Sequence, residues 1–300
     1  MALPCKKVFI DTKHRTPDSV DTSNFKIELP DTLYMPNNTV FYITDLAIPH
    51  SWFTIDNGWN RLYLQVSDTS STASTKPNEC RIIVLPNGSY SITSLAAEIQ
   101  FQANAAFSTS NIPTHFSVSA DIQKNTITIT PVVSTILAKV LTDQDLKTGM
   151  VNLVINGWSG AWTGPAYDHN NPEDINELLG NTSGAGAFFS GASPFVSGYI
   201  DLQYIKNVYL HSANLGNFQT VMANARGSRN IIKKIPVSAP DNQMIIYSES
   251  SSADWLECSK QTFKTLEFVL RDARGNQIPL HNSNVSFSIV FEKYKDMVDG

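Results

Sequence analysis

The stretch from Phe263 to Lys293 constrains the fold most, because apolar and polar residues alternate through it twice. The first apolar set is Leu266, Phe268 and Leu270, and the second is Val285, Phe287, Ile289 and Phe291. A period of two is typical of a strand with one buried face. The intervening residues 271–284 are too many for a tight hairpin. The two strands are therefore predicted to lie in opposite sheets of a sandwich.

Composition supports a mainly β protein. The chain has 300 residues, of which 16% are charged, compared with about 25% in typical soluble domains. Ser, Thr and Asn take the place of the missing charges, and their side chains compete for backbone hydrogen bonds in helix interiors. Strands joined by polar loops are therefore expected, in one large domain or two ordinary ones.

Eight segments have residue patterns typical of short strands. They are 25–29, 40–46, 62–66, 199–212, 230–237, 242–249, 263–272 and 284–293. The apolar phase of 199–212 shifts near Ile205, which suggests a bulge. Eight antiparallel strands with an insertion in the middle fit an all-β single jelly-roll sandwich.

The middle of the chain differs from both ends. A polar, low-complexity stretch, 67–79, separates the third strand from an expected helix over 95–107 with Ser94 as its N-cap. A hairpin is expected over 115–130, and a short helix is expected to start at Asn171 and Pro172. We therefore predict a jelly roll in two parts, 1–75 and 196–300, around a small α+β insertion domain, 76–195.

Net charge and cysteine usage exclude several kinds of partner and site. The net charge of −5 argues against nucleic acid as a partner and against broad binding to anionic membranes. The three cysteines, Cys5, Cys80 and Cys258, are far apart and favour neither a disulfide framework nor a zinc site. No signal peptide and no membrane-spanning run is expected, so we predict synthesis in a reducing cytosol.

Motifs of catalysis are missing from the sequence. It contains no GxSxG, HExxH or GxxxxGK[ST], and its six histidines form no HxH or HxxxH pair. The acids near Asp168 and Glu173 have oxygens suited to calcium, but they lack the spacing and glycine of a calcium loop. We predict no catalytic residue, cofactor or metal, and therefore no enzyme.

Two groups of residues are candidates for protein contact. The basic run Arg226, Arg229, Lys233 and Lys234 would meet an acidic partner face. Alternatively, it is a solvated loop leading into an edge strand whose lysines discourage misassociation. Trp52 and Phe53 would either close one end of the β core or anchor a subunit interface, where aromatic residues are enriched.

Two further aromatic residues are candidates for a receptor-facing site. Trp158 and Trp162 lie in a segment rich in Gly, Ser and Asn. Such rings would stack on a sugar or contact a receptor. Packing inside or between domains is the other interpretation.

Three groups of segments in a defined order resemble one family. FKIELPDTLYMP, YITDLAIPHSWFTID and RLYLQV are similar to the opening of the penton proteins of virophages and Polinton-like viruses, of the compact Mavirus type. IIVLPNGSYSITSLAAEIQ resembles the start of the insertion found in them. YIDLQYIKNVYLHSANLG and TLEFVLRDARGNQIPLHNSNVSFSIVFEKY resemble their closing strands. The resemblance covers nearly the whole chain.

This resemblance implies a minor capsid protein located in the virion. Five copies would form a homopentamer at each fivefold vertex of an icosahedral capsid and contact a double-jelly-roll major capsid protein. The insertion would face outward, which leaves a host receptor as a further partner. Assembly would take place inside the host cell, without insertion into a membrane.

A second hypothesis comes from another class of function. A carbohydrate-binding β-sandwich used in host attachment would place Trp158 and Trp162 in its site. The two hypotheses are compatible, because a vertex protein can also carry an attachment surface. A hydrolytic enzyme is disfavoured, since no motif supports one.

Overall fold

The computed structural model describes residues 5–56, 59–70, 79–110, 112, 114–142, 144–145, 174–181, 186–216, 220, 230–248 and 254–294. Its internal contacts divide the chain into two compact units. The first, the jelly-roll unit, comprises Met1–Trp52 and Ile205–Gly300, and the second, the inserted unit, comprises Phe53–Tyr204. Among the described residues, no helix is both long and apolar enough to cross a membrane.

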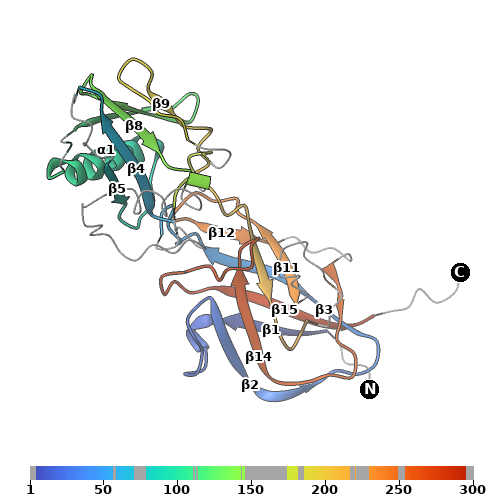
Figure 1. Cartoon of the computed structure of the whole chain (residues 1–300). Helices are drawn as coiled ribbons and strands as arrows, with labels where there is room; N and C mark the ends of the chain where they lie inside the picture. Colours follow the sequence, from blue (N-terminus) through green and yellow to red (C-terminus); the bar gives the residue numbers. More distant parts are fainter. Residues whose placement is uncertain are drawn as a thin grey trace, which may run out of the picture. The chain divides into compact units, whose positions relative to one another are not determined.

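Strands dominate the described part of the jelly-roll unit. Its elements are β1 (Lys6–Asp11), η1 (Thr12–His14), β2 (Asn24–Tyr34), β3 (Thr39–Pro49), β10 (Asn207–His211), β11 (Ile231–Pro236), β12 (Met244–Tyr247), β13 (Leu256–Glu257), β14 (Thr262–Arg271) and β15 (Ser286–Lys293). One sheet has the order β1-β15-β3-β12, with β13 also paired to β3, and the other has the order β11-β10-β14-β2. Figure 1 labels β1, β2, β3, β11, β12, β14 and β15 among these strands.

The strand order of the two sheets is that of a jelly roll. If the eight main strands are lettered B to I in chain order, the sheets read B-I-D-G and F-E-H-C. All of their pairings are antiparallel. The prediction of a single jelly roll is confirmed, and so is the placement of the last two strands, β14 and β15, in opposite sheets.

Three phenylalanines connect the two sheets in the core. Phe25 on β2 and Phe268 on β14 come from one sheet, and Phe287 on β15 comes from the other. All three side chains are buried. The ring centroids of Phe268 and Phe287 are 5.0 Å apart in a T-shaped arrangement, and those of Phe25 and Phe268 are 5.4 Å apart. This alternating set of inward residues is the apolar face on which the fold prediction depended.

The predicted division of the chain needs two corrections. The strand expected at 62–66 is β4 (Arg61–Asp68), which pairs with β5 (Glu79–Val84) and β8 (Ile136–Val140) in the inserted unit. The boundaries expected at 75 and 195 therefore differ from the observed changes at 52/53 and 204/205. The eighth jelly-roll strand is β1, whose mostly exposed residues at a sheet edge gave no alternating pattern.

The strand predicted over 199–212 is also shorter than expected. Only Asn207–His211 forms β10. Ile200 packs in the core of the inserted unit, whereas Val208 and Leu210 are buried in the jelly-roll unit, so one apolar run serves two cores. The change of register falls between Leu210 and His211 and not near Ile205.

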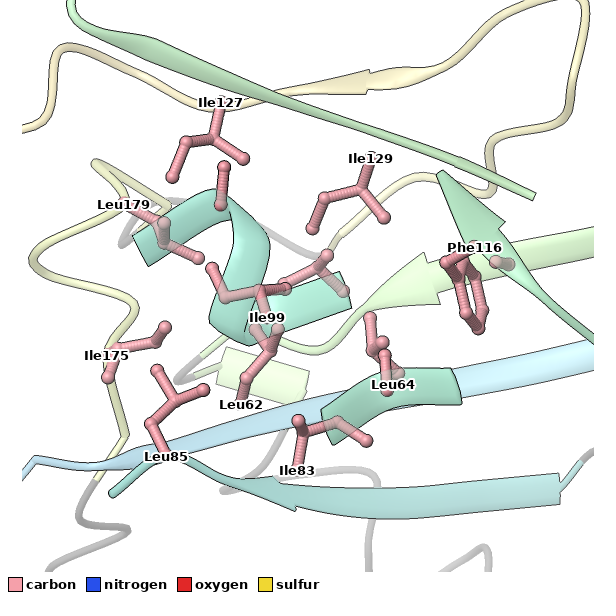
Figure 2. Close-up of a cluster of buried hydrophobic side chains, with 14 of the residues drawn as sticks. Leu62, Leu64, Ile83, Leu85, Ile99, Phe116, Ile127, Ile129, Ile175 and Leu179 are labelled. Atoms are coloured by element: carbon pink, nitrogen blue, oxygen red, sulfur yellow. The ribbon is translucent and has the colours of Figure 1, made fainter. Parts of the chain in front are cut away.

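The inserted unit has a helix and two small sheets in its described part. The remaining elements are α1 (Ile92–Ser108), β6 (Phe116–Asp121), β7 (Thr126–Pro131) and β9 (Phe195–Val196), and the sheets have the orders β5-β4-β8 and β6-β7-β9. Figure 2 shows Ile99 of α1 between Ile127 and Ile129 on one side and Leu62 on the other. The helix therefore supplies apolar side chains to a core shared with both sheets.

Local sequence explains α1 and the hairpin. Leu95, Ile99 and Phe107 are buried at helical spacing. The N-cap is Ser91 and not Ser94, because Ser94 occupies the third helical position and its hydroxyl completes a capping box with Ser91. The predicted hairpin is confirmed as β6 and β7, with Asn125 in the left-handed conformation at φ +50°.

The short helix expected from Asn171 appears only in part. Asn171 and Pro172 lie outside the described residues. Residues 176–180 form turns, in which the Leu179 amide donates to the Ile175 carbonyl as in a single helical turn. Gly180, at φ +63°, ends that turn as predicted.

We expect residues 53–204 to fold as an isolated protein. Their buried apolar cluster draws its members from residues 55–202 alone, and the rings of Trp59 and Tyr204 are 4.2 Å apart, which keeps the two ends of the unit close. Circular dichroism of this fragment should show one cooperative thermal transition. Ile99→Ala should lower the transition temperature, and a fragment that melts without cooperativity would contradict the prediction.

Candidate functional site

The candidate site is a polar surface on one sheet of the jelly-roll unit. Among the residues that the structure describes, no group of three or more His, Cys, Asp or Glu side chains has a geometry that could hold a metal ion. Polar side chains gather instead on the outward side of the sheet formed by β11, β10, β14 and β2. We call the surface around Lys26, His211, Glu267 and Arg271 the polar face.

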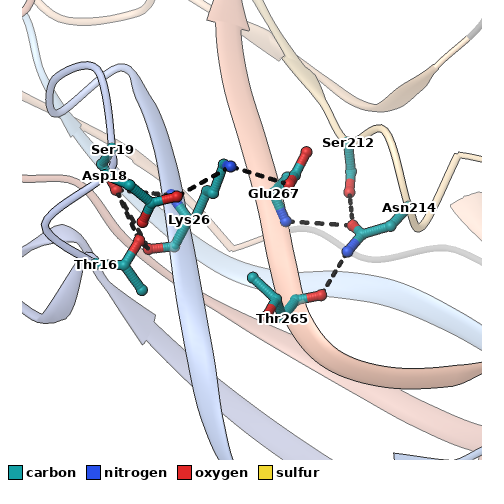
Figure 3. A network of polar contacts seen from close by, with 8 residues as sticks. All are labelled: Thr16, Asp18, Ser19, Lys26, Ser212, Asn214, Thr265 and Glu267. Carbon is teal, nitrogen blue, oxygen red and sulfur yellow. Dashed lines mark hydrogen bonds and ion pairs between the residues drawn. The ribbon is translucent and has the colours of Figure 1, made fainter.

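The loop after η1 covers the edge of this sheet at Lys26. The Lys26 amide donates to Ser19 Oγ at 3.0 Å, and the Thr16 amide donates to the Lys26 carbonyl at 2.9 Å. Lys26 Nζ lies 3.1 Å from Asp18 Oδ2 and 3.5 Å from Glu267 Oε1 (Figure 3). Hydrogen bonds from Thr16 and Lys26 hold the pKa of Asp18 below its usual value. The loop thus protects an edge strand that would otherwise expose unpaired backbone groups.

Asn214 continues the hydrogen bonding where β10 ends. Its side-chain oxygen accepts from the Glu267 amide at 3.2 Å and from Ser212 Oγ at 3.0 Å, and its side-chain nitrogen donates to the Thr265 carbonyl (Figure 3). Because β10 pairs with β14 only through residues 209–211, this amide replaces a strand along the next part of β14. It satisfies backbone groups that would otherwise lack a partner.

His211 is the most unusual group of the polar face. It lies at the end of β10, next to the register shift, and its side chain is only 7% exposed. Its Nε2 is buried and has no hydrogen-bond partner among the described residues. Burial, with a smaller effect from the charge of Arg271, lowers the pKa of His211 to about 4. The imidazole is therefore neutral at neutral pH.

A small pocket opens beside His211. Its volume is about 170 Å³. It is lined by Asn24, Phe25, Lys26, His211, Ala213, Asn230, Glu267, Val269 and Arg271. These residues come from β2, β10, β14 and the segments next to β10 and β11, so the packing of the sheet brings together residues that are far apart in the sequence.

His211 should make the protein less stable in acid. Its pKa is about 4 in the folded protein and about 6.5 in an unfolded chain, so the unfolded state binds the proton more strongly. The stability that depends on neutral His211 is therefore complete above pH 6.5 and is lost as the pH falls towards 4. Urea denaturation across this range should show a smaller loss of stability in His211→Gln than in the wild type. Equal losses would contradict the prediction.

Trp52 fits the first of the two roles predicted for it, which is to close one end of the β core. Its side chain is buried, and its ring centroid is 4.3 Å from that of His50, which in turn contacts the Ala239 carbonyl. A buried indole closes the core and is not a free surface anchor. Phe53, the first residue of the inserted unit, is half-buried.

The two lysines of the basic run are in different environments. Lys234 is exposed on the edge strand β11, as predicted. Lys233 is buried, with its Nζ 2.8 Å from Asp254 Oδ2 and 4.5 Å from the ring centroid of Tyr247, so the prediction that it forms a surface contact is wrong. The reason is the period of two along β11, since Lys233 points to the same side as the buried Ile235.

Several predicted residues lie outside the described part of the chain. They are Arg226, Arg229, Trp158, Trp162, Asp168 and Glu173. Their roles in contact or attachment stay predictions. Of the cysteines, Cys5 is exposed, and burial raises the pKa of Cys80 and of Cys258 to about 12, so these two thiols are unreactive in the folded protein.

Comparison with known proteins identifies the fold. No protein-family profile matches the chain, and no curated protein matches it. A crystal structure of the mavirus penton protein aligns with 97% of this chain and 100% of its own length, with a TM-score of 0.53 and 8% sequence identity. This chain has the fold of the mavirus penton protein. A cryo-electron microscopy structure of the Sputnik virophage matches more loosely, covering 96% of this chain and 98% of the matched one, with a TM-score of 0.41 and 15% identity.

Proposed function

We propose that this chain is a structural capsid protein that forms the pentameric vertex of a small icosahedral virus. Its partners would be four further copies of itself and a double-jelly-roll major capsid protein. The observation that carries the proposal is the alignment with the mavirus penton protein over 97% of this chain and all of that one. The family-like segments of the sequence agree with it, although a shared fold supports a function only by analogy.

The edges of one sheet suggest where copies would meet. A closed ring needs two different patches on opposite flanks of each subunit. β1 and β12 are the opposite edges of the sheet β1-β15-β3-β12. Each exposes a large apolar side chain, Phe9 at 75% and Ile246 at 71%. We propose these two edges as the flanks that meet in the ring, because pairing between them would also cover open strand edges.

Electron microscopy of the purified protein tests this function. Class averages should show rings with fivefold symmetry, with or without other capsid components. Single particles of one copy at every concentration, together with no incorporation into capsids, would contradict the proposal.

A further inference from the structure

The pocket on the polar face places Arg271 and His211 next to each other. His211 on β10 is directly opposite Val269 on β14, and Arg271 follows two residues later on the same side of β14. Diagonal neighbours of this kind lie about 7–8 Å apart between backbones, within reach of long side chains. Both residues line the pocket. A group bound there would therefore meet both side chains.

Arg271 carries a charge that no described carboxylate balances. Its Nη1 donates to the Gly275 carbonyl at 2.6 Å, and it forms no ion pair with any residue in the described part of the chain. Lys26 differs, because Asp18 and Glu267 both lie within ion-pair distance of its Nζ. The unbalanced cation of the pocket is therefore Arg271, and it favours an anionic ligand.

His211 offers a hydrogen bond that nothing in the described structure accepts or donates. A neutral imidazole carries one N–H donor and one acceptor nitrogen. Its Nε2 is buried in the protein without a partner, and an unpaired buried polar atom reduces stability. Because Nε2 has almost no accessible surface, a ligand in the pocket would contact the imidazole beside this atom and would not bond to it.

The size and charge of the pocket select a ligand. A volume of about 170 Å³ has room for a group of a few heavy atoms. The planar guanidinium of Arg271 matches the two oxygens of a carboxylate. Glu267 on the wall of the pocket disfavours a doubly charged anion such as phosphate. The amides of Asn24 and Asn230 supply further donors.

We propose that this pocket binds a carboxylate group at Arg271, next to the imidazole ring of His211. The group would come from a free small carboxylic acid or from an acidic side chain of a protein partner. The proposal goes beyond the capsid function and does not depend on it, because it concerns only side chains of one copy.

Nuclear magnetic resonance of the histidine side chains tests the proposal on the whole protein. Loss of one imidazole signal in His211→Gln assigns His211. Titration with sodium acetate should shift that signal and reach saturation, whereas sodium chloride and acetamide at equal concentration should not. The proposal is overturned if the signal does not move, or if acetamide moves it as acetate does. The titration itself uses the wild-type protein, and the variant serves only to assign the signal.

A matched pair of variants separates the pocket from general charge. Arg271→Gln should weaken acetate binding about tenfold, the loss expected for a charge-assisted hydrogen bond. Lys234→Gln removes an equal charge from the same face two strands away, opposite Tyr209 and in the same row as Arg271, and should leave binding unchanged. Equal weakening in both variants would overturn the proposal.

The source of the carboxylate is distinguished by a second titration. Blocked glutamic acid, with an acetylated amine and an amidated carboxyl end, presents the carboxylate as a protein side chain does. Tighter binding of this compound than of acetate supports a protein partner, and tighter binding of acetate supports a free acid. If the protein forms no pentamers but binds acetate, the proposed capsid function is contradicted while the proposed carboxylate site is supported.

Discussion

Phe268→Ala is expected to lower the free energy of unfolding of the jelly-roll unit by about 3–5 kcal/mol. Phe268 is fully buried and contacts rings from both sheets, Phe287 at 5.0 Å and Phe25 at 5.4 Å between centroids. Truncation would remove these contacts and leave a cavity between the sheets. Urea denaturation, followed by the transition of the jelly-roll unit, measures the loss.

Tyr34→Ala is the matched control for this variant. Tyr34 is also an aromatic residue on a strand of the jelly-roll unit, β2, but is 68% exposed. Its truncation should cost at most about 1 kcal/mol. Similar losses in the two variants would show that Phe268 is not part of a packed core.

Asp254→Asn should have the second largest effect, a loss of about 2–3 kcal/mol. The substitution keeps the shape of the side chain but removes the charge 2.8 Å from Lys233 Nζ. The Lys233 side chain is only 2% exposed, so its ammonium would stay in the protein interior without this carboxylate. Asp254 itself is about one-third exposed, which makes the expected loss smaller than for a fully buried pair. Urea denaturation again gives the value.

Removing both charges should restore stability. The double variant Lys233→Met, Asp254→Asn replaces the buried pair with an apolar and a neutral side chain, and such replacements are often neutral or stabilising. Its stability should return to within about 1 kcal/mol of the wild type. Lys124→Met breaks a pair on the surface, 3.5 Å from Asp121, and should change stability by less than about 1 kcal/mol. A double variant no more stable than Asp254→Asn would contradict this account of the pair.

The predicted fold rested on long alternating strands, and the errors occurred where alternation is ambiguous. The alternation around Phe268 and Phe287 is enough to indicate which faces of β14 and β15 are buried. β1 was missed because its residues are mostly exposed at a sheet edge. β4 was assigned to the wrong unit because a period of two shows that a strand exists but not which strand it pairs with.

The polar face could not be predicted from the sequence. Thr16, Lys26, His211 and Arg271 meet only because strands distant in the chain pair with one another. The spacing of these residues along the sequence does not indicate such a site. Lys233 is different, since its phase relative to Ile235 already indicated an inward side chain. Its neighbours in a basic run made it look like a surface residue.

Five copies are proposed to form a ring through the opposite edges β1 and β12. Native mass spectrometry, supported by sedimentation at several concentrations, tests it most directly. The wild type should have five times the chain mass of 33.1 kDa. Ile246→Lys, which places a charge on the β12 edge, should shift the protein to the mass of one copy. Phe101→Lys, at a position on α1 that is 66% exposed, should stay pentameric. A wild type with the mass of one or two copies at every concentration would contradict the claim.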